Sequence, residues 1–568
     1  MSAIDILECV LMMLAGLGVF LIGIKAMGDN LEAVAGNSLK TIFNKISNNR
    51  FTGVAVGAGV TAIIQSSSAT TVMIVGFVNA GVMTLTQATS IIMGANIGTT
   101  ITAQIVSLQS LPITAFFAAM ACVGAFMQTS KKLHVRNVGS IIAGVGVLFV
   151  GLDVMSSAMK QIAEIEAVRN LLNATTNPLL LLLLGAVITA VIQSSSVTTS
   201  IIISMGISGL IGLESAIYTT LGINIGTCIT AVLACIGSTV NAKRTSIIHL
   251  LFNCIGSFLF FIVFLILDRF TTFFTWMSGT FNGSIANQIA MFHTAFNVIT
   301  TLLLLPFVKV LPKLATLIVP DKKSSADDQK DIIETEKFQF IDNRLLSTPS
   351  IALMMIRKEI LAMADLAKNN LDLSINAVKN KDLSQKSLFD VREKRIDFLN
   401  KAITKYTIKV SSEHISYISE KESASYYYVV SNIERVGDYA QNIMEYTQEL
   451  IDYNAEFSDT AKKEVEDMKI AIDNLYDAVV SAFERQDITQ EETIKGLEEV
   501  VDDYKANLER SHLIRLGNGQ CSAESAGVFL SLVSNMERIA DHILNVFKSM
   551  KQYTQVTKTT HVLASPKA

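Results

Sequence analysis

Charge is absent from a long part of this sequence. Between Phe51 and Ser130, 80 consecutive residues include no Asp, Glu, Lys or Arg. A soluble domain needs charged side chains on its surface, so this absence excludes a soluble fold and predicts an integral membrane region. The first 30 residues also lack a basic start and an evident cleavage site. We therefore expect a retained membrane helix there rather than a signal peptide.

Cysteine is also scarce. The chain has six cysteines in 568 residues, and no two of them form a CxxC pair. This spacing argues against a cysteine metal site or a redox motif, and we interpret the cysteines as small apolar packing residues. A nucleophile–base set and a nucleotide-binding loop are likewise missing, so we do not expect an enzyme.

The charges that are present divide the chain in two. Residues 1–313 contain 14 Lys or Arg and 9 Asp or Glu, a net charge of +5, whereas residues 314–568 contain 32 and 41, a net charge of −9. An acidic soluble part argues against nucleic-acid binding. We predict a membrane domain over 1–313, a polar linker over 314–344, a soluble helical bundle over 345–555 and a flexible tail over 556–568.

The membrane domain contains a duplicated unit. Gln65-Ser66-Ser67-Ser68 returns 128 residues later as Gln193-Ser194-Ser195-Ser196, and Asn96-Ile-Gly-Thr99 returns as Asn224-Ile-Gly-Thr227. The same register relates Gly16 and Gly23 to Gly144 and Gly151. We place the two repeats at about 10–130 and 138–267. Matched halves with polar breaks in apolar sequence are typical of secondary transporters, whose binding site lies between the halves.

Two segments, 52–80 and 178–210, are unsuited to a simple membrane crossing. Each has two apolar arms of about a dozen residues around Gln-Ser-Ser-Ser, and such an arm reaches only about halfway through a bilayer. We predict that each segment is a re-entrant helical hairpin with the serines at its tip. The full membrane spans are expected at roughly 9–28, 86–106, 113–130, 138–157, 213–236, 246–267 and 287–310.

The basic loops indicate the orientation. If the hairpins do not cross, the loops that contain Lys40, Lys131 and Lys243 all lie on one side, together with the soluble part. The positive-inside rule then puts the soluble part in the cytoplasm and the N-terminus outside. Each repeat contributes three crossings, an odd number, so the repeats are inverted and their hairpins enter from opposite faces.

The hairpin tips have the chemistry of an ion site. The serines would form the first turn of the outgoing helix, where free backbone N–H groups and the positive end of the dipole favour an anion. The incoming helix ends in free carbonyls, which suit a hard cation such as Na⁺. The Gly and Asn of both Asn-Ile-Gly-Thr motifs suggest a local helix break that exposes further ligands. The alternative is that these hydroxyls only bond within their own helices.

The paired Gln-Ser-Ser-Ser and Asn-Ile-Gly-Thr motifs resemble the type II sodium–phosphate cotransporter family in its bacterial form, over about residues 5–312. The resemblance implies Na⁺-driven symport of inorganic phosphate, with Na⁺ as coupling ion, in the bacterial cytoplasmic (inner) membrane. The candidate phosphate- and sodium-binding residues are Gln65, Ser66, Ser67, Ser68, Thr70, Asn96, Thr99, Thr100, Gln193, Ser194, Ser195, Ser196, Thr198, Asn224 and Thr227.

The spacing of apolar residues in the soluble part predicts long amphipathic helices. This part also has an internal repeat of its own. Asn432-Ile-Glu-Arg-Val-Gly-Asp438 is similar to Asn535-Met-Glu-Arg-Ile-Ala-Asp541, so we predict two three-helix units. The region resembles the PhoU-like domains of bacterial phosphate regulation, which implies a cytoplasmic signalling partner. Carboxylates one turn apart can bind a divalent or ferric ion, although a solvated face with Glu–Arg pairing is equally compatible. The candidate metal ligands are Glu393, Asp397, Glu434, Asp438, Glu499, Asp503, Glu537 and Asp541.

Two rival functions remain open at this point. The first is a phosphate exporter or efflux valve, because sequence does not determine the net direction of transport. The second is a membrane-anchored phosphate sensor without transport, although intact polar motifs in both repeats argue against it. The sequence also leaves the Na⁺:phosphate ratio, the preference for phosphate over arsenate and a homo-oligomeric state open.

Overall fold

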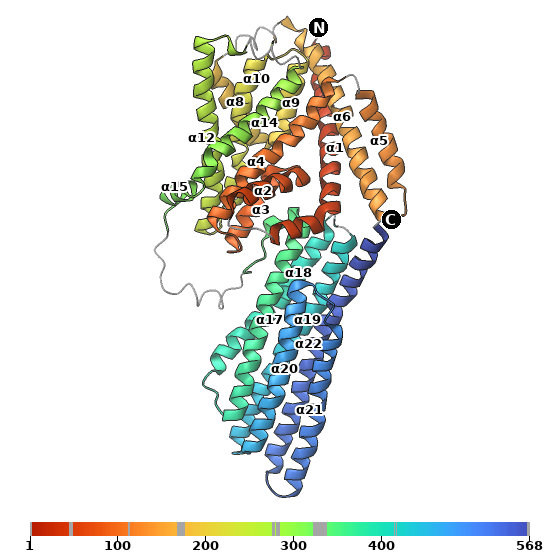
Figure 1. The fold of residues 1–568 in the computed structure, drawn as a ribbon, viewed down its shortest axis with the longest axis vertical. Helices are drawn as coiled ribbons and strands as arrows, with labels where there is room; N and C mark the ends of the chain where they lie inside the picture. Colours follow the sequence, from red (N-terminus) through yellow and green to blue (C-terminus); the bar gives the residue numbers. More distant parts are fainter. Residues whose placement is uncertain are drawn as a thin grey trace. The chain divides into compact units, whose positions relative to one another are not determined.

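The chain forms two compact helical units. A computed structural model describes residues 3–44, 49–111, 114–166, 177–274, 284–321, 338–413 and 417–564, together with residues 168, 279 and 415. The first unit comprises 1–323 and 343–350, and the second comprises 324–342 and 351–568. Within the described residues every regular element is a helix, as the all-α prediction requires (Figure 1).

The first unit contains the apolar helices. These are α1 (Ala3–Asn44), α2 (Arg50–Ile64), α3 (Ser67–Asn79), α4 (Leu85–Ser107), α5 (Thr114–Gln128), α6 (Leu133–Ala163), α8 (Pro178–Ile192), α9 (Ser195–Ile207), α10 (Leu213–Gly226), α11 (Cys228–Ala234), α12 (Val240–Phe270), α14 (Ile285–Leu304) and α15 (Val310–Ile318). Among the described residues, six segments are long and apolar enough to cross a membrane: Ile4–Ala35, Leu85–Ser110, Leu133–Ala163, Leu213–Ala234, Val240–Phe270 and Ile285–Phe307.

One expected span is shorter than predicted. Helix α5 has 15 residues, because Lys131 and Lys132 follow it closely and α6 starts at Leu133. At 1.5 Å per residue it extends about 22 Å, less than the ~30 Å of a hydrocarbon core. Closely spaced small residues pack it along α6: a Cβ on Gly124 would lie 2.3 Å from the Ala143 nitrogen.

Both Gln-Ser-Ser-Ser segments fold as pairs of short helices. Hairpin 1 consists of α2 and α3, with 15 and 13 residues, and hairpin 2 consists of α8 and α9, again with 15 and 13. The chain turns at Gln65 and Gln193, which have left-handed backbones with φ of 58° and 59°. The next residue, Ser66 or Ser194, then caps the outgoing helix.

The duplicated glycines of the first helices face each other. A Cβ on Gly16 would lie 2.8 Å from the Gly151 carbonyl oxygen, and one on Gly23 would lie 2.8 Å from that of Gly144. Helices α1 and α6 are therefore antiparallel and in backbone contact, as small residues allow in membranes. Each glycine contacts the repeat equivalent of the other, so the interface is built from the same patch twice.

Glycines also hold α2 against α4 and α8 against α10. A Cβ on Gly94 would lie 2.0 Å from the Val54 carbonyl oxygen, and one on Gly98 would lie 2.5 Å from that of Ala58. Helix α4 continues unbroken through Asn96-Ile-Gly-Thr99, contrary to the predicted break, because its glycines serve this close packing. In the second repeat the helix does end, at Gly226, and α11 resumes at Cys228.

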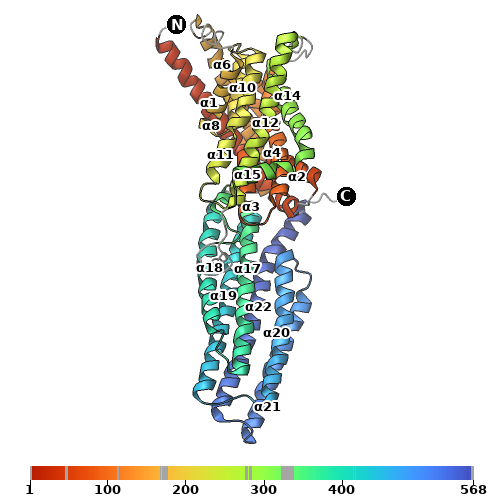
Figure 2. The ribbon, with the colours of Figure 1, turned by 90° about the vertical axis from the view of Figure 1, so that its left-hand side faces the viewer.

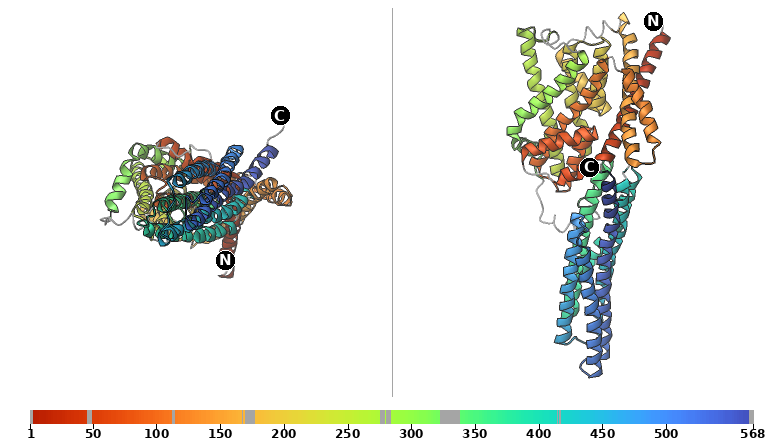
Figure 3. Two further views of the ribbon diagram at one scale, coloured as in Figure 1. Left: turned by 90° about the horizontal axis from the view of Figure 1, so that it is seen from below. Right: turned by 45° about the vertical axis from the view of Figure 1, so that its right-hand side comes forward.

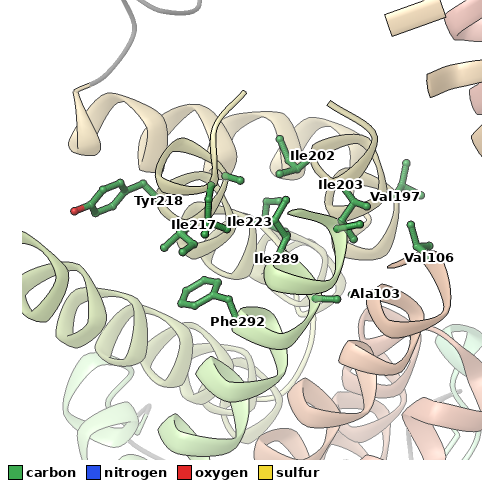
Figure 4. Packing of buried hydrophobic residues seen from close by; sticks show 14 of the residues in the cluster. Ala103, Val106, Val197, Ile202, Ile203, Ile217, Tyr218, Ile223, Ile289 and Phe292 are labelled. Carbon is green, nitrogen blue, oxygen red and sulfur yellow. The ribbon is translucent and has the colours of Figure 1, made fainter. Parts of the chain in front are cut away.

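An apolar core includes α9, the outgoing helix of hairpin 2. Figure 4 shows Val197 and Ile203 of α9 near Val106 and Ala103 of α4, together with side chains of α10 and α14. The cluster also includes residues of α1, α6 and α12. The outgoing helix of the second repeat thus packs against the first repeat. In the same way, α3 packs against α11 and α12. Each hairpin is therefore supported by the other half of the duplication.

A short stretch after the linker belongs to the first unit. Residues 343–350 contain the 3₁₀ turn η3 (Asn343–Ser347), whose Leu345 lies over Gly76 of α3. The Arg344 guanidinium donates to the Ala234 carbonyl oxygen at 2.6 Å and to the Ser238 hydroxyl. These residues were predicted to divide between the linker and the bundle.

Over its described residues, the second unit is a bundle of six long helices, which lie side by side in Figures 1, 2 and 3. They are α17 (Pro349–Asn380), α18 (Lys386–Ser412), α19 (Tyr417–Asp452), α20 (Asp459–Arg485), α21 (Glu491–Gly517) and α22 (Ala523–Ala564). Two groups of three follow each other in the chain, as predicted. Helix α22 continues to Ala564, into the stretch 556–568 that was predicted to be a flexible tail.

Candidate functional site

The tip of hairpin 1 is a helix N-terminus with hydroxyls around it. Ser66 accepts a hydrogen bond from the Ala69 backbone N–H at 3.1 Å and so caps α3. Thr70 donates to the Ser66 carbonyl oxygen at 3.0 Å. None of the described hydrogen bonds involves the backbone N–H of Ser67 or Ser68. The first turn of α3 therefore keeps donors for an anion, as the sequence predicts.

Hairpin 2 repeats this geometry residue by residue. Ser194 accepts from the Val197 N–H at 3.3 Å, and Thr198 donates to the Ser194 carbonyl oxygen at 3.0 Å. Ser195 and Ser196 follow in the first turn, and both side chains are buried. Two independent copies thus preserve the same capped N-terminus.

The glutamines at the tips have an unfavourable backbone. A left-handed conformation costs a non-glycine residue roughly 1–2 kcal/mol, and glycine is the usual residue at such a helix end. Both copies nevertheless have glutamine here, so the side chain itself must be needed. In hairpin 1 it is held at both ends: the Gln65 amide donates to the Ala62 carbonyl oxygen, and its Oε1 accepts from Thr102 at 2.9 Å.

The Asn-Ile-Gly-Thr motifs are buried, and their side chains bond within their own helices. Asn96 and Asn224 each donate to the carbonyl oxygen four residues earlier, at 2.9 Å. Thr99 and Thr227 do the same at 3.1 and 2.9 Å. Thr100 donates to the Ile97 carbonyl oxygen. Each Asn amide is turned toward its helix, so its Oδ1 is the atom available as an acceptor.

The structure joins tip 1 to the second repeat. Thr230 of α11 lies three residues beyond Thr227, and its Oγ1 is 3.2 Å from the Ser68 Oγ. The motif of one repeat therefore adjoins the hairpin tip of the other. Thr102 and Thr230 were not among the predicted site residues. The 128-residue register could have identified them, because Ile101-Thr102 returns as Ile229-Thr230.

The acidic residues of the bundle form two sets, and two residues of the second set differ by one position from the prediction. Burial raises the pKa of the Glu393 carboxyl to about 7, and Asp397, Asp438 and Glu434 contribute to the rise. In the second set, burial raises the pKa of Asp502, and Glu537 and Asp541 add to it.

The prediction named Glu499 and Asp503 for this second set. The structure instead places Glu498 and Asp502 beside Glu537 and Asp541. The core positions Ile494 and Val501 turn Glu498 toward α22 and leave Glu499 exposed.

The structure gives no support to a metal centre at these acids. No three His, Cys, Asp or Glu side chains group as metal ligands in the part of the chain that the structure describes. Basic side chains are paired with them instead: Arg435 lies 3.3 Å from Asp438, and Lys505 lies 3.1 Å from Glu537. The alternative considered from the sequence was a solvated face with Glu–Arg pairing, and the pairs described here are Arg–Asp and Lys–Glu.

Known proteins share both units. The Na⁺/Pi-cotransporter family pattern matches residues 19–157 and 151–283, one match for each repeat. The PhoU domain pattern matches residues 360–447 and 465–550, one match for each three-helix group. No solved structure matches the chain.

Three relatives show how the identity and the matched length vary among similar proteins. YqeW of Bacillus subtilis (strain 168), an uncharacterized protein, is 30% identical over 304 residues, which are 53% of this chain and 96% of that protein. YjbB of Escherichia coli (strain K12), whose name assigns it provisionally to inorganic phosphate export, is 22% identical over 93% of this chain and 94% of its own. Sodium-dependent phosphate transport protein 2A of Mus musculus is 38% identical over 99 residues, 17% of this chain and 16% of that protein.

The duplicated helix pairs, the apolar helices long enough to cross a membrane and the 96% coverage of YqeW agree with one another. The chain therefore belongs to the Na⁺/Pi-cotransporter family and has a PhoU domain in its second unit.

Proposed function

We propose that this protein couples Na⁺ to the movement of inorganic phosphate across the bacterial cytoplasmic membrane. The observation that supports this best is the paired tip: a left-handed glutamine followed by a serine-capped helix, present twice with the same geometry. Phosphate would be held between the N-termini of α3 and α9 by backbone N–H groups and by the hydroxyls of Ser67, Ser68, Ser195 and Ser196.

The proposed phosphate site needs a bound cation because the sequence around tip 1 has no positively charged side chain. No Lys or Arg occurs between Phe51 and Ser130, so phosphate at tip 1 has no side-chain counter-charge from that stretch. Burying an unpaired anion is costly. Na⁺ bound to the carbonyls that end α2 and α8, and to Asn96 and Asn224, would supply the charge. Coupling to Na⁺ follows directly, since phosphate binds well only when the cation is present.

The two repeats are inverted in this proposal. The antiparallel contact of α1 with α6, in which each glycine meets the equivalent of the other, supports a two-fold axis perpendicular to the helices. The basic loops put the N-terminus outside and the PhoU domain in the cytoplasm. There the domain would regulate transport and offer a surface to a phosphate-signalling protein.

Equivalent positions of the two repeats test the inversion. In a cysteine-free background, a cysteine replacing Ile4 is expected to react with an impermeant thiol reagent added to intact cells. A cysteine replacing Lys132, its equivalent at the start of α6, should react only after permeabilisation, because inversion places the two on opposite faces. Labelling of both from the same side would contradict the inverted repeat.

Transport itself is tested with purified full-length protein in liposomes. We expect labelled phosphate to accumulate when a Na⁺ gradient is imposed, and not with an equal K⁺ gradient. The name of YjbB favours export as the second candidate function. Loading phosphate inside and imposing the reverse gradient measures that direction with the same vesicles. Absence of Na⁺-dependent flux both ways, with phosphate binding retained, would favour a sensor.

A further inference from the structure

Two equivalent threonines both bind the same hairpin tip. Thr102 of α4 donates to the Gln65 Oε1 at 2.9 Å. The Oγ1 of Thr230 in α11 donates to the Thr227 carbonyl oxygen at 2.7 Å and lies 3.2 Å from the Ser68 Oγ. Thr102 and Thr230 occupy the same place in the two repeats. One is thus bonded to the hairpin of its own repeat and the other to the hairpin of the opposite repeat.

The corresponding bonds of hairpin 2 are not made. Two-fold symmetry would pair Thr230 with Gln193, and Thr102 with Ser196. Neither bond occurs among those described, and Gln193 is exposed whereas Gln65 is half-buried. Thr102 uses its one proton on Gln65, so a bond with Ser196 would need Ser196 as the donor, and no such bond is described. The arrangement is therefore asymmetric at a point where the sequence is symmetric.

A second contact shows the same asymmetry. Inside hairpin 1, Thr61 donates to the Thr70 hydroxyl at 3.1 Å and joins the two helices. The equivalent Thr189 of hairpin 2 is buried, and its Oγ1 has no hydrogen bond within the described residues. Hairpin 1 is also packed against α1 through α2, whereas α6 contacts hairpin 2 through α9. The tip of hairpin 1 therefore has hydrogen bonds whose equivalents in hairpin 2 are not made among the described residues.

We propose that Thr102 and Thr230 form a latch that holds one hairpin tip at a time. In this structure both hold hairpin 1. In the opposite state, Thr230 moves to Gln193 and Thr102 moves to Ser196, so hairpin 2 is tied and hairpin 1 is free. The exchange rests on the proposed inverted repeat, because the two-fold axis between the repeats makes the two states equivalent on opposite sides of the membrane. The threonines are positioning residues: they set which tip is exposed.

Disulfide trapping tests the exchange. In a full-length protein without native cysteines, pair A replaces Ser68 and Thr230 by cysteine, and pair B replaces Ser196 and Thr102. We expect both pairs to cross-link in liposomes with Na⁺ and phosphate. Because Ser68 and Ser196 belong to the proposed phosphate site, each variant is compared with itself: the oxidised protein should carry less than about a tenth of the phosphate flux of the same variant kept reduced. As an oxidation control, Cys9 is retained and Gln161→Cys added, because Cys9 Sγ lies 3.1 Å from the Gln161 side chain in the α1–α6 contact.

A variant with all four cysteines decides between exchange and coexistence. Mass spectrometry of single chains should find disulfide A or disulfide B, and never both in one molecule. Both together, or pair A and the control cross-linking while pair B does not, would overturn the latch. If the cysteine-free parent shows no Na⁺-dependent flux, the proposed function fails instead, and the cross-linking pattern still reports on the latch.

Side-chain substitution gives an independent readout. Thr102→Val keeps the shape and removes the hydroxyl, and one lost hydrogen bond changes an equilibrium about two- to tenfold. We expect Thr102→Val to lower the yield of disulfide A relative to the control, because hairpin 1 loses a tie. Thr102→Ser should restore it. Equal yields in all three proteins would contradict a positioning role.

Discussion

Replacing Ser67 and Ser195 together by alanine is expected to weaken phosphate binding by about a hundredfold to ten-thousandfold. These equivalent serines lie in the first turns of α3 and α9, their side chains are buried, and none of the described hydrogen bonds uses their hydroxyls. Each hydroxyl is therefore available to a ligand. Losing one hydrogen bond to a charged group costs about 1.5–3 kcal/mol, or roughly ten- to hundredfold, and two at separate tips should add.

The measurement is the phosphate concentration for half-maximal Na⁺-driven flux in liposomes. Ser204→Ala is the matched control, because it also removes a buried hydroxyl from α9, far from the tip, and its equivalent in the first repeat is Gly76. Ser66 and Ser194 are less informative, since they cap helices and their loss also costs stability. Wild-type flux in the double variant would place the phosphate site elsewhere.

Gly94→Val and Gly222→Val are each expected to prevent folding. At these equivalent positions a Cβ would lie 2.0 Å from the Val54 carbonyl oxygen and 1.9 Å from that of Leu182. Both oxygens belong to the backbone of a hairpin helix, which cannot move aside without separating the helices. The cost should exceed the ~3 kcal/mol of ordinary overpacking. Monodisperse protein in detergent, measured by size-exclusion chromatography, should fall more than about tenfold.

Gly59→Val is the control for this effect. A Cβ on Gly59 meets no atom within 4 Å, and the equivalent residue in the second repeat is already Val187. The same substitution on α2, the partner of α4 in this contact, should therefore leave the yield unchanged. If Gly94→Val eluted like the wild type, the close α2–α4 contact would not exist in the folded protein.

The tips could be predicted because repetition removes ambiguity. One Gln-Ser-Ser-Ser in an apolar stretch has several readings, but two in the same register with short arms point to matched hairpins, and α3 and α9 do begin at Ser67 and Ser195. The left-handed glutamines were not foreseen, because glycine is the usual residue at such a turn.

Other features depend on which surfaces meet, and one sequence does not contain that information. Gly and Asn within a membrane helix fit a break or a close contact equally well, and in α4 the contact with α2 decides. Glu498-x-x-x-Asp502 and Glu499-x-x-x-Asp503 have identical spacing, so only the packing of α21 selects between them. The latch was missed because Thr102 and Thr230 look like ordinary membrane-helix threonines until their partners are known.

The contact between α1 and α6 bears on how such a chain can arise. Gly16 meets Gly151 and Gly23 meets Gly144, so each half presents one patch and receives the same patch in return. An isologous interface of this kind is complete with two copies of a single sequence. With the inverted repeat that we propose, a half-length ancestor would have assembled as a homodimer of oppositely oriented copies before gene fusion joined them. Fusion then allowed the two halves to diverge, as Gly59 and Val187 have.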